Sequence, residues 1–296
     1  MSFSMRVAIY GRTFDASGSD QVRDLIRILE QSGASLIIEE QYLRLLAGSI
    51  PFASPPAAFH RDGLRRGDAD YLLSIGGDGT ILDTVTIVRD SGIPVLGINT
   101  GRLGFLSSVA KDEMEPAISL LNRKQFLINE RTLLRADSDE HYFGPTNYAL
   151  NELTVHRKET PSLIAIQVWV DDVFVNAYWA DGLIVSTPTG STGYSLSCGG
   201  PIVYPQAGTF VITPIATHNL TVRPLVIPDD KSVKVVVDER YGHYTAGLDS
   251  RYCEIAPGNA LVVKKEEFRF NLIQFEEEEF FNTIREKLKW GLDTRN

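Results

Sequence analysis

The chain has 296 residues, 43% of them hydrophobic, which is long enough for two ordinary domains with cores of their own. Its formal net charge of −9 provides no electrostatic basis for binding nucleic acid or an anionic membrane. We find no apolar run of membrane-spanning length and no secretory leader, and Cys198 and Cys253 lack a metal-type spacing, so we expect a reduced, cytoplasmic protein.

The first 125 residues predict alternating strands and helices. Strands are expected at 6–10, 35–40, 71–76 and 94–99, and helices at 19–33, 41–48, 80–92 and 111–124. Residues 49–69 are punctuated by Pro and Gly and predict a mobile loop. Apolar strands that alternate with helices are typical of a parallel sheet covered on both faces. The fold class expected for residues 1–125 is therefore a Rossmann-like α/β domain.

From residue 126 to 273 the pattern changes to one strand after another, which predicts an all-β domain of the sandwich type. The pair Asp171–Asp172 lies between two apolar strands and predicts a hairpin turn. Residues 274–296 form the tail, in which 276–292 predict an amphipathic helix. We expect this helix to pack back on the N-terminal domain.

The segment SIGGDGTILD (74–83) joins a predicted strand to a predicted helix through a glycine turn. Such a turn presents free backbone N–H groups and the positive end of a helix dipole, which together favour an anion. Leu82 stands where the dinucleotide fingerprint needs a third glycine, and no lysine follows as in a Walker loop. The turn instead carries Asp78. A carboxylate beside phosphates can hold a divalent cation or take a proton from an attacking hydroxyl, and both belong to phosphoryl transfer.

Three further segments fit a nucleotide enzyme. INTGRLGFL (98–106) follows the next strand, and its small residues let the backbone approach a ligand. Arg102 in this segment either contacts a phosphate or is a solvated loop arginine. DGLIVSTPTGSTGYSLSCGGPI (181–202) offers hydroxyls, amides and one aromatic face, as a nucleoside pocket needs. LNEL (150–153) adds an amide and an acid, which alone are a weak signal.

In this order, GGDGT (76–80), GINTGRLGFL (97–106), NEL (151–153) and the 181–202 loop resemble the NAD kinase family over nearly the whole chain. The resemblance implies an N-terminal α/β domain, a C-terminal β-sandwich, and substrate between them. It implies transfer of the γ-phosphoryl group of ATP to the 2′-hydroxyl of the adenosine ribose of NAD, giving NADP. It also implies Mg²⁺ or a similar divalent cation and a homodimer or homotetramer.

The resemblance also assigns site residues. Asp78 matches the family's general base, Asn151 and Glu152 match the pair that holds the adenosine side of NAD, and Asp181 matches the contact to the nicotinamide riboside. The implied NAD-binding positions are Asp78, Gly79, Phe105, Asn151, Glu152, Asp181, Thr192, Gly193, Tyr194 and Ser197. The implied phosphate-binding positions are Gly76, Gly77, Gly79, Thr80 and Arg102. No metal ligands are assigned.

The chain departs from the family pattern at three places. Gly193 replaces an alanine, Trp179 replaces a frequent arginine, and LDSR (248–251) stands for a family DGQ, so that Asp249 is carried over weakly. Two other functions stay open at this point. One is a non-catalytic NAD(H)-sensing protein, in which Asp78 only hydrogen-bonds a ribose. The other is a lipid kinase of the diacylglycerol type, which shares a GGDGT-like motif. STPTGSTGY (186–194) as an adenine pocket and the absence of a basic, membrane-facing surface argue against it.

Overall fold

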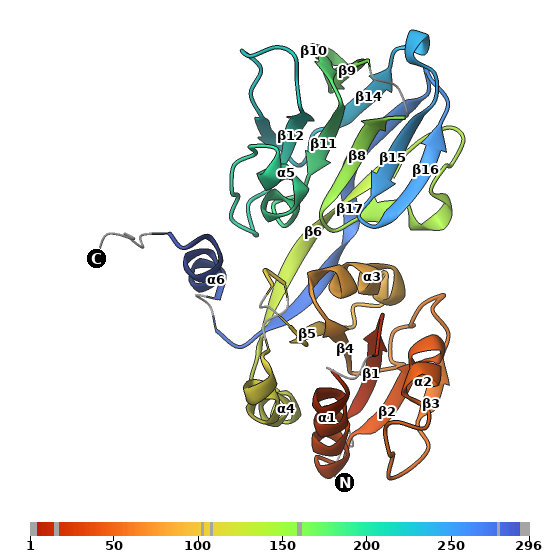
Figure 1. The fold of residues 1–296 in the computed structure, drawn as a ribbon, viewed down its shortest axis with the longest axis vertical. Helices are drawn as coiled ribbons and strands as arrows, with labels where there is room; N and C mark the ends of the chain where they lie inside the picture. The colour runs from red at the N-terminus through yellow and green to blue at the C-terminus, as the bar shows by residue number, and fades with distance from the viewer. Residues whose placement is uncertain are drawn as a thin grey trace. The chain divides into compact units, whose positions relative to one another are not determined.

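The computed structural model describes residues 5–14, 18–101, 104–106, 109–158, 162–276 and 279–290. The chain divides into two compact units. Unit 1 comprises residues 1–129 together with 271–296, and unit 2 comprises residues 130–270 (Figure 1).

Unit 1 alternates strands and helices as predicted. Its elements are β1 (Arg6–Gly11), α1 (Ser19–Gln31), β2 (Ser35–Glu39), α2 (Glu40–Leu46), β3 (Ala57–Phe59), β4 (Tyr71–Gly76), α3 (Asp78–Val88), β5 (Val95–Asn99), α4 (Met114–Asn122) and α6 (Glu279–Leu288). None of the described helices is long and apolar enough to cross a membrane.

The strands of unit 1 form a parallel sheet in the order β3-β2-β1-β4-β5, and the end of β17 (Ala260–Gln274) joins it beside β5, where Leu272 pairs with Val95. The chain passes from β1 outward to β2 on one side, and from β4 outward to β5 on the other. The strand order therefore reverses between β1 and β4. In parallel α/β sheets, ligands bind beyond the carboxyl ends of the strands at such a point.

Both faces of this sheet are covered. Val7 and Ile9 of β1 belong to a core that also contains Leu25 of α1 and Ile118 of α4. Because successive strand residues point to opposite faces, Tyr10 points the other way, and its hydroxyl bonds Asp83 of α3. The Rossmann-like α/β prediction is confirmed.

Two local predictions for unit 1 were wrong. The helix expected at 80–92 is α3, which begins at Asp78 directly after the N-cap Gly77 and ends at Val88, followed by Arg89 with φ +47°. The predicted loop at 49–69 contains β3, whose residues 57–59 pair with β2. That strand is three residues long and follows two prolines, so its pattern is too short to distinguish from a loop.

Unit 2 is built of strands. Its elements are β6 (Leu127–Asp137), β7 (Tyr148–Ala149), β8 (Glu152–Arg157), β9 (Ile164–Val170), β10 (Val173–Ala180), β11 (Gly182–Ser186), α5 (Tyr194–Ser197), β12 (Thr209–Ile215), β13 (Leu225–Pro228), β14 (Val233–Val237), β15 (Tyr244–Leu248), β16 (Arg251–Ile255) and most of β17. The hairpin turn between β9 and β10 is confirmed at Asp171 and Asp172, with φ of +47° and +64°.

Two antiparallel sheets form unit 2. One has the order β13-β12-β11-β8-β15-β16, and the other the order β10-β9-β14-β17. Their inner faces share one core, in which Val155 and Leu183 come from the first sheet and Ile166 and Val235 from the second. Two sheets packed on a common apolar core are a sandwich, so the predicted β-sandwich is confirmed.

Candidate active site

The glycine turn after β4 is built around conformations that a side chain would block. Gly76 has φ +148°, and a Cβ placed there would lie 2.3 Å from Oγ1 of Thr80. Gly77 caps α3, and its carbonyl accepts a hydrogen bond from the amide of Thr80 at 2.9 Å. Position 76 therefore needs glycine for steric reasons, and the turn leads directly into the positive end of the α3 dipole.

Asp78 is the first residue of α3, and its carboxylate is held by backbone. Oδ2 accepts a hydrogen bond from the amide of Phe105 at 2.7 Å, and Oδ1 accepts one from the amide of Leu106 at 3.1 Å. The carboxylate thus links the glycine turn to the segment that follows β5. The ammonium of Lys287 in α6 lies 5.2 Å from the ring centre of Phe105. Arg102, predicted to bind phosphate, lies outside the described residues.

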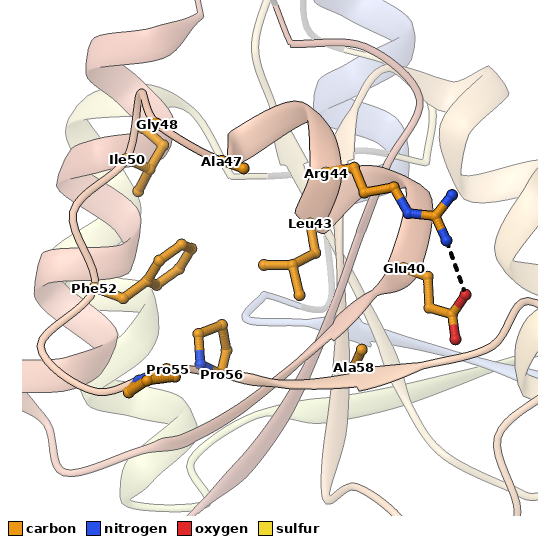
Figure 2. Close-up of a pocket in the computed structure, with 10 residues that line it drawn as sticks. All are labelled: Glu40, Leu43, Arg44, Ala47, Gly48, Ile50, Phe52, Pro55, Pro56 and Ala58. Atoms are coloured by element: carbon orange, nitrogen blue, oxygen red, sulfur yellow. Dashed lines mark hydrogen bonds and ion pairs between the residues drawn. The ribbon is translucent and has the colours of Figure 1, made fainter.

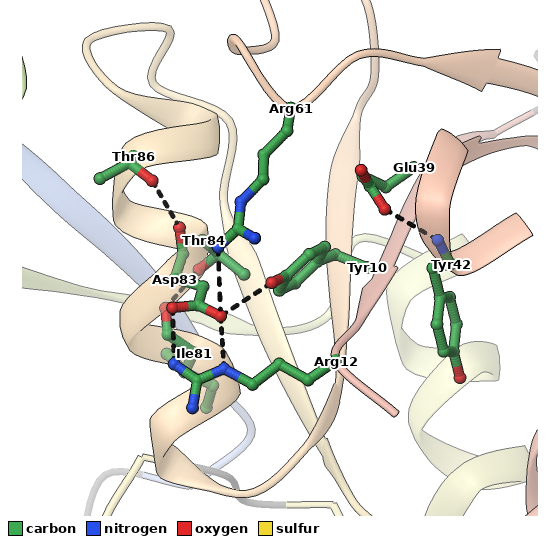
Figure 3. Close-up of polar contacts among 9 residues, drawn as sticks. All are labelled: Tyr10, Arg12, Glu39, Tyr42, Arg61, Ile81, Asp83, Thr84 and Thr86. Atoms are coloured by element: carbon green, nitrogen blue, oxygen red, sulfur yellow. Dashed lines mark hydrogen bonds and ion pairs between the residues drawn. The ribbon is translucent and has the colours of Figure 1, made fainter. Parts of the chain in front are cut away.

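A cluster of charges that the sequence interpretation missed lies one turn further along α3 (Figure 3). The carboxylate of Asp83 accepts two hydrogen bonds from Arg12, at 2.5 and 2.6 Å, and one from the hydroxyl of Tyr10 at 2.7 Å. The guanidinium of Arg61 lies 3.3 Å from the same carboxylate. Burial would raise the pKa of Asp83, but the hydrogen bonds from Arg12 and Tyr10 and the two guanidinium charges outweigh it, so the pKa is lowered. Asp83 is therefore a carboxylate that binds two arginines.

One signal in the sequence could have located this cluster. Arg12 directly follows β1, and the carboxyl ends of parallel strands collect functional residues. The partner Asp83 lies 71 residues further along the chain. A sequence pattern that extends over a few residues cannot predict a contact between residues so far apart in the chain.

In unit 2, Asp249 holds the Asn151–Glu152 segment. Its carboxylate accepts hydrogen bonds from the amides of Leu150 and Asn151, each at 2.8 Å, and of Glu152 at 3.2 Å. Asp249 adopts φ +53° in the turn between β15 and β16. The residue carried over weakly from the family pattern thus fixes the backbone of the two predicted adenosine-binding residues.

Glu152 is a buried carboxyl, 8% exposed, whose Oε2 has no hydrogen-bond partner among the described residues. Burial, reinforced by the nearby Asp249, raises its pKa to about 8. A Cβ added at Gly193 would lie 3.3 Å from this Oε2 and 3.4 Å from Nδ2 of Asn151. The structure therefore brings Asn151, Glu152 and Gly193 together around a buried carboxyl oxygen of Glu152.

Tyr194 adds an aromatic surface to this part of unit 2. Its ring stacks on His156, with centroids 5.7 Å apart and an interplanar angle of 17°, and 39% of the residue stays exposed. His156 was not predicted as a site residue, although period-two alternation along β8 places it on the same face as Glu152. Asp181 pairs with Arg157 at 2.6 Å, and its charge acts on both His156 and Tyr194.

The loop at 187–200 uses many of its hydroxyls to hold itself. Thr187 donates to the carbonyl of Leu150, Ser191 donates to that of Pro188, and Ser195 bonds Thr213. Of the predicted positions, Thr192 donates to the carbonyl of Thr189, whereas Ser197 is exposed at the end of α5. Part of the Ser/Thr enrichment is therefore structural.

Two cavities in unit 1 are lined by residues other than the predicted site residues. A cavity of about 650 Å³ lies in unit 1 between α2 and residues 50–58; Figure 2 shows its largely apolar lining, with the Glu40–Arg44 ion pair at one edge. Another, of about 490 Å³, lies between α4 and α6. Among the described residues, no group of three or more His, Cys, Asp or Glu could hold a metal ion.

Comparison with known proteins decides the family. A family model described as ATP-NAD kinase N-terminal domain matches residues 7–126, and one described as ATP-NAD kinase C-terminal domain matches residues 150–275. The NAD kinase of Flavobacterium psychrophilum is 44% identical over 99% of this chain and 100% of its own length. The chain belongs to the NAD kinase family. A second relative supports the same family: the NAD kinase of Cytophaga hutchinsonii is 40% identical over 99% of this chain and 100% of its own length.

Solved structures of NAD kinase type share the fold. The yeast NADH kinase complexed with NADH matches with a TM-score of 0.85 at 24% identity, covering 99% of this chain and 89% of its own. An NAD kinase from Archaeoglobus fulgidus in complex with ATP matches with a TM-score of 0.72 at 24% identity, covering 97% of this chain and 100% of its own. The family resemblance expected from the motifs is confirmed, and the diacylglycerol-kinase alternative has no support.

Proposed function

We propose that this chain transfers the γ-phosphoryl group of ATP to the 2′-hydroxyl of the adenosine ribose of NAD, giving NADP and ADP. The observation that carries the assignment is Asp78, a carboxylate oriented by two backbone amides at the start of α3, in the glycine turn of a NAD kinase family member. A carboxylate held in this way can accept the proton of an attacking hydroxyl without reorganising its own surroundings.

The phosphates of ATP are assigned to the turn formed by Gly76, Gly77, Gly79 and Thr80. Backbone amides and the α3 dipole favour an anion there, and glycine at 76 and 77 keeps the backbone open to it. Arg102 remains a proposed phosphate contact.

The adenosine half of NAD is assigned to Asn151, Glu152 and the loop that carries Gly193 and Tyr194. The carboxyl group of Glu152 and Nδ2 of Asn151 supply polar groups for hydrogen bonds, and the exposed face of Tyr194 supplies a stacking surface. Thr192 and Ser197 line the same loop. Asp181 is assigned to the nicotinamide riboside, and Phe105 and Gly79 to apolar and backbone contacts with NAD.

Mg²⁺ is proposed as part of the ATP substrate. The described residues offer no group of three metal-ligating side chains, and Mg²⁺ is commonly held by substrate phosphates, waters and one or two carboxylates. Asp78 is the carboxylate nearest the phosphate turn in sequence. When bound, the cation neutralises charge on the transferring phosphoryl group.

We also propose a homodimer or homotetramer in the cytoplasm, with the C-terminal helix packed on the N-terminal domain. The contact between Lys287 and Phe105 supports the helix placement. Free thiols at Cys198 and Cys253 support a reducing compartment.

The direct test is to incubate the purified protein with NAD, ATP and Mg²⁺ and to measure NADP. A kinase accumulates NADP in proportion to enzyme and time. A sensing protein binds NAD without forming NADP, and that result would overturn the proposal.

A further inference from the structure

Arg12 occupies the position at which a parallel sheet presents residues to a ligand. It follows Gly11, the last residue of β1, and Gly11 pairs with Ile75 of β4. Arg12 and the glycine turn therefore follow the carboxyl ends of two adjacent strands, β1 and β4, between which the strand order reverses.

The side chain of Arg12 lies against the glycine turn. A Cβ added at Gly79 would be 3.3 Å from Nη1 of Arg12. Because position 79 is glycine, no side chain separates the guanidinium of Arg12 from the first turn of α3. The residue is part-exposed, at 41% of its side chain, so its guanidinium is accessible to a ligand as well as paired.

Asp83 sets this position. Its carboxylate, 7% exposed, accepts hydrogen bonds from Nε and Nη2 of Arg12 (Figure 3). The remaining nitrogen of the guanidinium, Nη1, is the one that lies near Gly79. Asp83 lies four residues after Gly79 on α3, which places both on one face of the helix. A bidentate pair fixes both the direction and the plane of a guanidinium.

The charge of the cluster also favours an anion. Arg12 and Arg61 both pair with the carboxylate of Asp83, so two guanidinium groups gather around one carboxylate of α3. The GGDGT turn lacks the lysine that Walker loops use against phosphate charge. A buried ion pair is weak evidence for stability, since apolar residues of similar size often serve as well. A function in ligand binding accounts better for an arginine held at this edge.

From these observations we infer that Arg12 contacts the polyphosphate of ATP and that Asp83 is the residue that positions it. The inference rests on the proposed function. It adds a specific guanidinium to a phosphate site otherwise assigned to backbone amides.

Steady-state kinetics of Arg12→Met, with ATP and NAD varied in turn, test the contact. Loss of one charge-assisted contact raises the KM for ATP roughly 10- to 100-fold, while the KM for NAD changes little. Inorganic tripolyphosphate, used as a probe, inhibits the wild type competitively against ATP and inhibits Arg12→Met at correspondingly higher concentration. Arg23→Met is the matched control, because Arg23 forms an exposed ion pair with Asp20 in the same unit.

Asp83→Asn and Tyr10→Phe test the positioning role. Asp83→Asn is expected to raise the KM for ATP and weaken tripolyphosphate inhibition, and Asp83→Glu to restore part of both. Tyr10→Phe removes one hydrogen bond to Asp83 but keeps the ion pair, so it should alter the unfolding midpoint more than the KM for ATP. Should Asp83→Asn fail to fold, Arg12→Met alone decides.

Unchanged KM for ATP and unchanged tripolyphosphate inhibition in Arg12→Met would overturn the inference while leaving the kinase assignment intact. Absence of NADP formation by the wild type would instead overturn the assignment itself. The two failures are therefore distinguishable.

Discussion

Asp78 and Phe105 are joined by a 2.7 Å hydrogen bond, in which the carboxylate of the glycine turn accepts the backbone amide of the segment after β5. A second bond from Leu106 engages the other carboxylate oxygen. The proposed base thus has a fixed orientation before any substrate arrives. Such preorganisation is a large part of how enzymes lower barriers, because no reorganisation is needed during the reaction.

Asp249→Asn is expected to weaken NAD binding by disturbing the Asn151–Glu152 segment. The carboxylate accepts three backbone hydrogen bonds, whereas an amide presents N–H groups to at least one of those donors. We expect a loss of about 1–3 kcal/mol in unfolding free energy. Urea unfolding and NAD titration measure the two effects, with the exposed Asp230→Asn as control. Wild-type NAD affinity in a folded Asp249→Asn would contradict the positioning of Asn151 and Glu152 by Asp249.

Gly190→Ala and Gly193→Ala should differ sharply. A Cβ at Gly190 would lie 2.2 Å from the backbone oxygen of Asn151, so either the loop or the backbone just before β8 must shift, at a cost of about 1–3 kcal/mol or more. At Gly193 the nearest atom would be 3.2 Å away, which a small movement relieves. Thermal unfolding and the KM for NAD should change strongly in Gly190→Ala and little in Gly193→Ala. Equal effects would show that the close approach at 190 is unimportant.

Glu152→Gln is expected to change how stability depends on pH. The pKa of Glu152 is about 8 in the folded protein against 4.5 ordinarily, so between these values the folded state keeps a proton that the unfolded state has lost. Stability therefore falls as pH rises through this window, and glutamine removes that loss. Relative to wild type, Glu152→Gln should gain stability from pH 5 to pH 8.5, on the order of a few kcal/mol.

Urea unfolding at a series of pH values measures this change. Glu254→Gln is the control, because Glu254 is exposed and its hydrogen bond with Lys158 lowers its pKa. A stability difference between Glu152→Gln and wild type that stays constant with pH would show that Glu152 ionises normally.

Chelation with excess EDTA is expected to abolish NADP formation and to weaken ATP binding. Backbone amides, a dipole and an arginine are insufficient partners for a triphosphate without a divalent cation. NAD binding should stay nearly unchanged, since the proposed NAD pocket is polar and needs no cation. Calorimetric titration of each nucleotide, with and without added Mg²⁺, measures this. Activity that survives complete chelation would contradict the proposed Mg–ATP substrate.

Much of the fold followed from local patterns, because alternation of apolar residues and the position of glycines are encoded over a few residues. The turn at 76–80, the hairpin at Asp171–Asp172 and the two fold classes were all predicted in this way. The exact start of α3 was missed, because glycine at position 77 caps the helix without a side-chain signal.

The Asp83 cluster and the role of Asp249 could not be predicted by the same means. Asp83 meets Arg12 across 71 residues, and Asp249 meets Asn151 across 98. Each looks like an ordinary acid in its own segment. Its partners become visible once the sheets have brought distant segments together.

The central claim is that Asp78 accepts the proton of the attacking hydroxyl, and the turnover of Asp78→Asn tests it most directly. The amide oxygen can still accept the hydrogen bond from the Phe105 backbone, although the NH2 group then faces the Leu106 amide, and the side chain cannot take a proton from a hydroxyl. We expect kcat for NADP formation to fall by about 10²–10⁴-fold, with NAD affinity largely retained and the exposed Asp90→Asn unaffected. Turnover near that of wild type in Asp78→Asn would contradict the account.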